Sequence, residues 1–453
     1  MKLGLSGRLT QATLHSPLTP LFLLAALAVG LLALLTIPRE EEPQISVPMV
    51  DVIVDADGLR AQDAAELLTL PLEAIVKGIN GVEHVYSQTR DDKVMVTARF
   101  QVGTREDDAV LRVHERIRGN YDRLPVGTPE PLIVKHGIND VAIVTLTLSP
   151  KPDQAARWND AALYDLAEKL RLELVKVDDI GLTYLAGGAP GQVRVEPDLD
   201  RLALNHVTME ELAARIRAAS GTLLAGGVRD AGVQRDVVAG RSLVGVPDIG
   251  QLLLTTRDGR PVYVRDVARV VMGPAQAEHR VWNLSRAEDG GPWRQTPAVT
   301  VALAKRAGAN AVVVSQAILD RVEKLKGSLI PDGINVGVTR DYGETANEKA
   351  NELLLHLGIA TLSIVVLIRL AIGWREAVVT LVVIPVTILL TLFAAELMGY
   401  TINRVSLFAL IFAIGILVDD AIVVVENIAR HWAMRDGRDR VRATIDAGLR
   451  GQP

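Results

Sequence analysis

The stretch Phe412–Arg430, FAIGILVDDAIVVVENIAR, places two adjacent aspartates, Asp419 and Asp420, inside a long apolar run. A helix needs about 20 mostly apolar residues to cross about 30 Å of hydrocarbon, and residues 405–428 reach that length. An aspartate at the centre of such a helix costs about 2.5–3.5 kcal/mol, whereas each Leu, Ile or Val contributes only about 0.3–0.6 kcal/mol. The stretch therefore predicts a membrane helix whose two carboxylates face a protein interior or a hydrated path.

The two carboxylates are close enough to disfavour double ionisation, so at least one is expected to take up and release protons. Because neighbouring residues on a helix point about 100° apart, the two side chains can address different partners. Gly415, one turn before Asp419, leaves room for another backbone or side chain. Glu426 and Asn427 lie nearer the end of the run and are expected to be interface or capping groups.

Two other interpretations of the aspartates are weaker. A solvated pair at a helix end does not fit, because largely apolar residues continue from Asp420 to Ile428. An intramembrane aspartyl protease needs two carboxylates that converge on one water, which normally requires two helices. Adjacent residues splay apart, and none of the other three predicted spans contains an aspartate. We therefore expect no enzyme here.

Those three spans are residues 18–37, 353–372 and 377–395. A cleaved signal peptide is disfavoured for the first one, because its apolar run is too long and no small-residue cleavage site follows. Basic residues mark the cytoplasmic side of membrane proteins. They are Lys2, Arg8, Arg369, Arg375, Arg430, Arg435, Arg438, Arg440 and Arg442. Residues 1–17 and 429–453 are then cytoplasmic, and the region between the first two spans lies outside.

Composition narrows the choice of function class. The 453 residues carry a mild net charge of −5, which predicts no nucleic-acid partner. The chain has no cysteine, so it can form neither a disulfide framework nor a thiolate metal site. The five histidines of the predicted outer region are scattered along the sequence, and no cluster of Met, His or Cys is there to receive a soft metal. They are His84, His114, His136, His206 and His279. No metal site and no cofactor is predicted.

The outer region begins with a strand-helix-strand-strand-helix-strand pattern over residues 38–136, in which the apolar period switches between two and 3.6. This order is typical of a ferredoxin-like split-βαβ unit, with Pro71 expected to kink or divide its first helix. A second copy occupies residues 137–190 and 274–340. Residues 191–273 interrupt it and are predicted to be an inserted domain.

Within that insertion, residues 225–241 are rich in glycine and carry both basic and acidic side chains. Composition alone leaves two interpretations open, an extended arm and a loop on the surface. A strand pair follows near residues 250–270, with Asp258-Gly259 as its turn signal.

The motif GILVDDAIVVVENIAR, preceded by GYTINRVSLFALIFAI, resembles the fourth transmembrane helix of resistance–nodulation–division (RND) efflux permeases of the acriflavine-resistance, hydrophobe-amphiphile type. The resemblance extends over nearly the whole chain. It includes the GANA helix start at Gly308–Ala311 and TLVVIPVTILLT in the third predicted span. The expected fold class is a transmembrane α-helical bundle joined to α+β periplasmic subdomains.

The resemblance implies a proton-driven exporter of the bacterial inner membrane that acts as a homotrimer, with a periplasmic adaptor protein and an outer-membrane channel as partners. Asp419 and Asp420 would form its proton relay, and Gly415 would allow close helix packing beside them. The split-βαβ units would be porter subdomains. The insertion would be a docking domain whose hairpin, with Gly226, Gly227, Gly232 and Gly240, reaches into the next subunit.

One departure from the family is large. The family is built from two similar halves with twelve spans, and this chain has four predicted spans. We therefore expect a fragment or truncated reading frame of a longer permease that exports organic amphiphiles or drugs. The alternatives are a transport-inactive membrane module that only assembles or regulates, and an RND exporter of metal cations.

Overall fold

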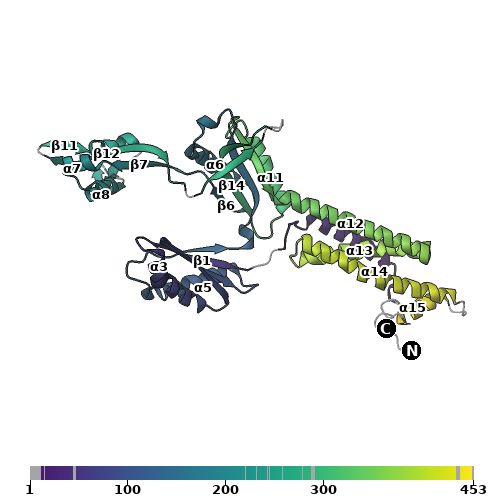
Figure 1. Ribbon diagram of the computed structural model, residues 1–453. Helices are drawn as coiled ribbons and strands as arrows, with labels where there is room; N and C mark the ends of the chain where they lie inside the picture. Colours follow the sequence, from purple (N-terminus) through teal and green to yellow (C-terminus); the bar gives the residue numbers. More distant parts are fainter. Residues whose placement is uncertain are drawn as a thin grey trace.

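The computed structural model shows an elongated molecule, with long helices at one end and a small inserted unit at the other (Figure 1). The structure describes residues 12–14, 16–43, 47–219, 221–230, 232–241, 243, 245–257, 259–277, 279–286, 291–434 and 439–450. Most of the predicted N-terminal cytoplasmic segment 1–17 lies outside the described residues.

The first unit after the apolar helix α2 (Leu18–Thr36) is built from four strands, with one layer of helices on one face of the sheet. Its sheet has the order β2-β3-β1-β4 with antiparallel neighbours, which is the order of a split-βαβ unit. The strands are β1 (Met49–Ala56), β2 (Val82–Arg90), β3 (Asp92–Phe100) and β4 (Leu132–His136). The helices are α3 (Ala61–Ala64), α4 (Leu70–Lys77) and α5 (Glu106–Arg118).

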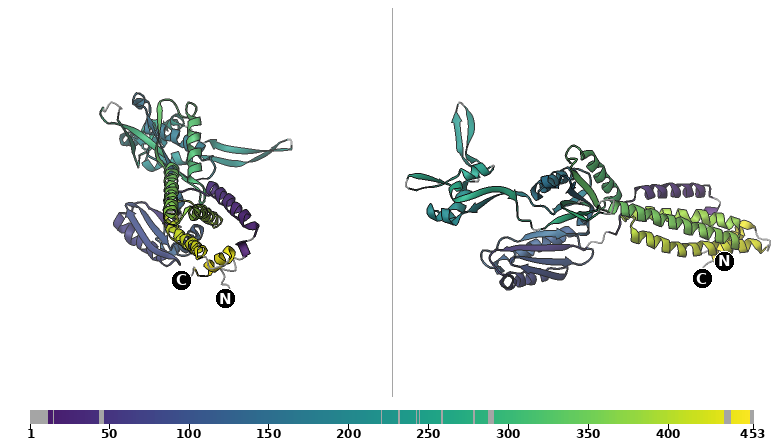
Figure 2. Two further views of the ribbon diagram at one scale, coloured as in Figure 1. Left: turned by 90° about the vertical axis from the view of Figure 1, so that its right-hand side faces the viewer. Right: turned by 45° about the horizontal axis from the view of Figure 1, so that its top comes forward.

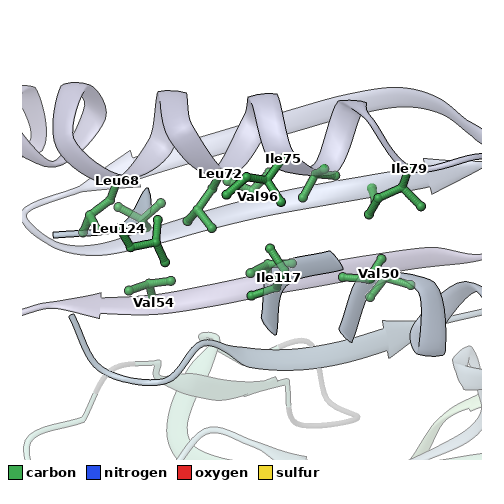
Figure 3. Close-up of a cluster of buried hydrophobic side chains, with 14 of the residues drawn as sticks. Val50, Val54, Leu68, Leu72, Ile75, Ile79, Val96, Ile117 and Leu124 are labelled. Atoms are coloured by element: carbon green, nitrogen blue, oxygen red, sulfur yellow. The ribbon is translucent and has the colours of Figure 1, made fainter. Parts of the chain in front are cut away.

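The core of this unit follows from strand and helix periodicity. Every second residue of β1 and β3 points toward the helices, since side chains alternate along a strand. Val50, Val54 and Val96 come from the sheet, and Leu72 and Ile117 come from the helices that cover it (Figure 3). The opposite face of the sheet carries exposed side chains such as those on β2.

The first helix is divided, as Pro71 suggested. A π-helical turn at Ala65–Thr69 separates α3 from α4, and Pro71 occupies the first turn of α4. Proline has no N–H to donate and crowds the preceding turn, so the helical hydrogen-bond pattern has to change just before it.

The second unit repeats the same topology with a long interruption. Its sheet runs β6-β14-β5-β15, so it matches the first unit strand for strand. The strands are β5 (Ala142–Pro150), β6 (Ile180–Ala186), β14 (Arg294–Lys305) and β15 (Ile334–Asp341). The helices are α6 (Asp160–Leu174) and α11 (Ala311–Leu325). Strand β13 (Val281–Ser285) lengthens the sheet by pairing with the start of β14.

The interruption enters and leaves through one antiparallel ribbon. Strand β7 (Gly191–Pro197) pairs along its whole length with β12 (Ala268–Pro274). Between them lie short helices and one strand pair around a small apolar core, together with a projecting hairpin. These elements are α7 (Leu199–Leu204), α8 (Met209–Ala219), α9 (Val246–Gly250), β10 (Leu253–Arg257), β11 (Arg260–Tyr263) and α10 (Val264–Val267).

The glycine-rich stretch is a two-stranded hairpin and not an irregular loop. Strand β8 (Gly221–Asp230) pairs with β9 (Val233–Arg241), and the ribbon extends away from the rest of the molecule (Figure 2, left). Gly232 follows β8 with φ +82°, and Gly226 has φ +133° beside a β-bulge, so both occupy conformations that favour glycine.

Three helices among the described residues are long and apolar enough to cross a membrane. They are α2 (Leu18–Thr36), α12 (Tyr342–Ala371) and α13 (Trp374–Leu397). The fourth predicted span falls within α14 (Arg404–Ala433), a helix of 30 residues whose described opening part, Arg404–Ala413, is apolar. Helix α15 (Arg440–Arg450) follows.

Helix α12 connects the second unit to the bundle without a linker. It begins one residue after β15 ends, because the Asp341 side chain caps it by accepting a hydrogen bond from Glu344 N at 3.0 Å. The helix therefore starts eleven residues before the predicted span 353–372 and carries a polar first segment outside the apolar part.

Candidate functional site

The paired aspartates lie on α14, whose start is fixed by a capping box. Asn403 Oδ1 accepts hydrogen bonds from Val405 N and Ser406 N, and Ser406 Oγ accepts one from Asn403 N at 2.9 Å. At 1.5 Å per residue, Asp419 lies about 24 Å along the helix from this cap, well inside a bilayer-length segment. The side chains of Gly415, Asp419 and Asp420 lie outside the part of the structure that is described.

The described part of α14 is packed into the bundle. Leu407 is buried in a cluster with Ile384 and Leu392 of α13, and Leu354 of α12 lies against the same cluster. Ile422, two residues after Asp420, also contacts it. The helix that carries the aspartates thus has neighbours on α12 and α13 and is not an isolated span.

The C-terminal end of α14 is held by α15. Asn427 Nδ2 donates a hydrogen bond to Ala447 O at 2.7 Å, and Trp432 Nε1 donates to Thr444 Oγ1 at 3.1 Å. His431 is buried, with Nδ1 2.9 Å from Asn427 O, and its Nε2 has no hydrogen-bond partner among the described residues. Glu426 is exposed. Asn427 therefore serves to attach α15.

The outer end of α14 meets the chain that leaves α2. Glu40 N donates to Ile402 O, and Ile402 N donates to Pro38 O, both at 2.9 Å, so the two segments form a short parallel bridge. On its other side this segment accepts a hydrogen bond from Ala311 N, the start of α11, at Arg39 O. Residues 38–40 thus lie between the bundle and the second split-βαβ unit.

A buried ion pair strengthens this contact. Glu40 Oε1 lies 2.5 Å from Lys305 Nζ, the last residue of β14, and their side chains are 3% and 9% exposed. The other carboxylate oxygen, Oε2, accepts a hydrogen bond from Thr401 Oγ1 at 3.3 Å. One carboxylate therefore contacts the second split-βαβ unit through Lys305 and the connection ahead of α14 through Thr401.

A cavity of about 190 Å³ adjoins the pair and is lined by Glu41, Asn139, Val141 and Tyr342, among others. The Glu41 Oε2 atom is buried and has no hydrogen-bond partner among the described residues. Arg39 Nη1 donates to Asn347 Oδ1 at 2.9 Å, which ties the same segment to the first turns of α12.

Sequence reasoning missed the Glu40–Lys305 pair. Its only signals are an acidic run directly after the first span and a lysine that ends the apolar strand AVTVALAK. Either one is typical of an exposed charge near a membrane surface. Since the residues are 265 positions apart, only the fold shows that they meet.

The structure separates the other predicted site residues from the aspartates. Gly226, Gly227 and Gly240 lie on β8 and β9, and Gly232 lies between these strands. No group of three or more His, Asp or Glu side chains suited to a metal ion occurs in the described part of the chain.

The pattern of the AcrB/AcrD/AcrF family matches residues 12–449. The chain belongs to this family. This is a family of RND efflux transporters and not of enzymes. RND proteins reside in the inner membrane, and the three candidate spans agree with that location.

Several relatives in this family carry the name Multidrug resistance protein MdtC. The one from Edwardsiella ictaluri (strain 93-146) is 28% identical over 441 residues, which cover 95% of this chain and 40% of the relative. The one from Salmonella typhi is 26% identical over 93% of this chain, and that from Yersinia pseudotuberculosis serotype O:1b is 27% identical over 91%. This chain spans about 40% of the length of these relatives.

Proposed function

We propose that this chain supplies the relay helix and the first periplasmic units of a proton/substrate antiporter. Asp419 and Asp420 form the proton relay, and Gly415 allows a neighbouring element to approach them. The observation that carries the proposal is the pair of adjacent aspartates inside a 30-residue helix that packs against two other long apolar helices. Intramembrane carboxylates of this kind mark proton pathways.

The driving force has a definite size. A proton that moves through a potential of 100 mV delivers about 2.3 kcal/mol, and only a group that changes protonation can use it. Asparagine keeps the shape of aspartate but cannot titrate. Replacing either aspartate by asparagine should therefore remove proton coupling while the packing of the helix stays the same.

The periplasmic units serve substrate passage and assembly in this proposal. Residues 38–136, and 137–190 with 274–340, are porter subdomains. Residues 191–273 are a docking domain whose β8–β9 hairpin reaches into the neighbouring subunit of a homotrimer. A periplasmic adaptor protein and an outer-membrane channel complete the export path in the inner membrane assembly. The family and the projecting hairpin support these assignments.

The substrates proposed are organic amphiphiles. The relatives named for multidrug resistance support this class, as does the pair of aspartates at the relay position.

The test is efflux from cells that express the complete gene. Asp419→Asn and Asp420→Asn should each abolish export of a fluorescent organic cation, while membrane insertion and oligomeric state stay unchanged. Glu426→Gln is the matched control, because this carboxylate lies on the same helix and is exposed. Full export by both asparagine variants would remove the relay from the proposal.

A further inference from the structure

We infer that the Glu40–Lys305 ion pair, together with Thr401, transmits the movement of the relay helix to the second split-βαβ unit. These three residues are positioning residues of the transport cycle, and the inference rests on the function proposed above. Their contacts form one chain: Lys305 at the end of β14, the Glu40 carboxylate, and Thr401 two residues before the cap of α14.

The geometry suits transmission because the parts on both sides are rigid. Ile402 is fully buried and bonded through its backbone to the residue-38–40 segment, and Asn403 caps α14 directly afterwards. On the other side, Lys305 ends a central strand of the second unit. A shift of α14 along or about its axis therefore moves Thr401 and Ile402, and with them Glu40.

Burial makes the connection stiff. The pair lies out of water, so separating the two charges would leave each of them without its opposite charge in a poorly solvated place. An exposed ion pair could break and be replaced by water at little cost. The pair thus favours joint movement of the two segments over sliding between them.

Helix α12 offers a second, covalent link between the bundle and the same unit. Helix α12 follows the last strand, β15. The ion pair instead holds the end of β14, and the neighbouring Arg39 O holds the start of α11 by accepting a hydrogen bond from Ala311 N. The two links hold different points of one unit. Together they can convert a relative shift of α14 and α12 into a rotation of that unit.

The test uses single cysteines, because the chain has none of its own. One probe replaces Val313 on α11 and reports on the second unit, and the other replaces Tyr400 and reports on the bundle side; both positions are exposed. The measurement is the rate of reaction with a water-soluble maleimide in membrane vesicles from the complete gene, with and without an imposed pH gradient.

In the wild type, both probes should change their reaction rate when the gradient is applied. In Asp419→Asn neither should change. In the double variant Glu40→Gln, Lys305→Met, the Tyr400 probe should still respond and the Val313 probe should lose its response. Lys305→Arg keeps the charge and should retain both responses.

The matched control is Asp165→Asn with Lys169→Met, an exposed pair on α6 of the same unit. It should leave both probe responses at the wild-type level. If the Glu40/Lys305 double variant does not accumulate in the membrane, Thr401→Val replaces it, since this change removes only the hydroxyl group that Oε2 accepts from.

The probe responses distinguish failure of the transmission role from failure of the proton-driven function. A Val313 response that persists in the double variant overturns the transmission role, as does a wild type in which only Tyr400 responds. A wild type in which neither probe responds contradicts the proton-driven function itself. The first two results leave the relay intact, so the two failures can be told apart.

Discussion

At the scale of single residues, Gly30 sets how closely α2 approaches α13. A Cβ atom at this position would lie 2.4 Å from Leu389 Cβ and 2.8 Å from its carbonyl carbon, which no side chain tolerates without movement of a backbone. Small residues at helix contacts are the usual means of close packing inside membranes, where lipid tails supply no hydrophobic drive between helices.

Gly30→Val should therefore separate the two helices and lower the stability of the bundle by about 1–3 kcal/mol, the usual cost of overpacking. Thermal unfolding in mild detergent measures the loss. Gly358→Val on α12 is the control, since nothing lies within 4 Å of the Cβ that it would add. Equal stability of the two variants would contradict the close α2–α13 contact.

The buried pair gives a second prediction at this scale. Lys305→Met alone removes the positive charge that faces the buried Glu40 carboxylate and should cost about 3–5 kcal/mol, whereas adding Glu40→Gln should recover most of the loss. Denaturant unfolding measures the free energy of unfolding of both variants, and the double variant should be the more stable of the two. A loss below about 1 kcal/mol in both variants would contradict the burial of the pair.

The residue scale also shows what the sequence could and could not reveal. Asp419 and Asp420 stand out because their cost in an apolar run is visible locally. Glu40 and Lys305 are as unusual, but their burial depends on a contact across 265 positions, and each looks like an ordinary flanking charge. Local patterns carry no information about such pairs.

At the scale of elements, Arg171 forms an ion pair within helix α6 and also joins this helix to β6 by a hydrogen bond. Arg171 Nη2 lies 2.5 Å from Glu168 Oε1, and Arg171 Nη1 donates to Thr183 Oγ1 at 3.0 Å. The hydrogen bond from Arg171 holds the pKa of Glu168 below its ordinary value of 4.5, against a smaller opposing effect of burial.

A lowered pKa means that the pair stabilises the folded unit fully above about pH 4.5 and loses this contribution as the pH falls through the lowered pKa. Arg171→Met should cost about 0.2–1 kcal/mol at pH 7, since the pair is partly exposed, and the difference from wild type should shrink toward pH 3. The difference in the free energy of unfolding is measured by urea unfolding followed through the fluorescence of Trp158, with the other tryptophans changed to Phe. A cost that stays constant with pH would mean that packing against Thr183, and not charge, holds Arg171.

The strand and helix order of both split-βαβ units could be predicted, because strands and helices differ in apolar period and the joins contain Gly, Pro and Asp. Composition alone did not decide the form of the Gly-rich stretch, and only the family resemblance indicated a hairpin. Its valines alternate with charged residues too irregularly for a clear strand signal, and Gly232 and Gly226 satisfy a turn and a bulge that only the paired strands define. For the π-helical turn before Pro71, the sequence predicted only a kink or division of the first helix and not the type of turn.

At the scale of the whole molecule, the projecting β8–β9 hairpin decides assembly in our account. Its described valines Val228, Val233, Val237 and Val238 are 42–59% exposed, so the arm does not bury its apolar side chains within its own subunit. If each subunit gives an arm and accepts one, the contact is head-to-tail and has to close into a ring.

Deleting residues 222–240 should therefore shift the protein from trimer to monomer in mild detergent, with both split-βαβ units still folded. Val233→Cys should crosslink to the neighbouring subunit with a bifunctional maleimide reagent. A cysteine at Leu204, exposed on the same insertion but outside the hairpin, should not. If the deletion variant remained fully trimeric, the hairpin would not be needed for assembly, and the docking role would be wrong.

The central claim is that protons pass through Asp419 and Asp420 in exchange for substrate. Inverted membrane vesicles that contain the product of the complete gene, loaded with a pH indicator and acidified inside by respiration, measure this exchange directly. Adding an organic amphiphile should dissipate the pH gradient in the wild type and in Glu426→Gln, and should leave it intact in Asp419→Asn and Asp420→Asn. If the two asparagine variants dissipated the pH gradient on substrate addition as fast as the wild type, this result would contradict the relay.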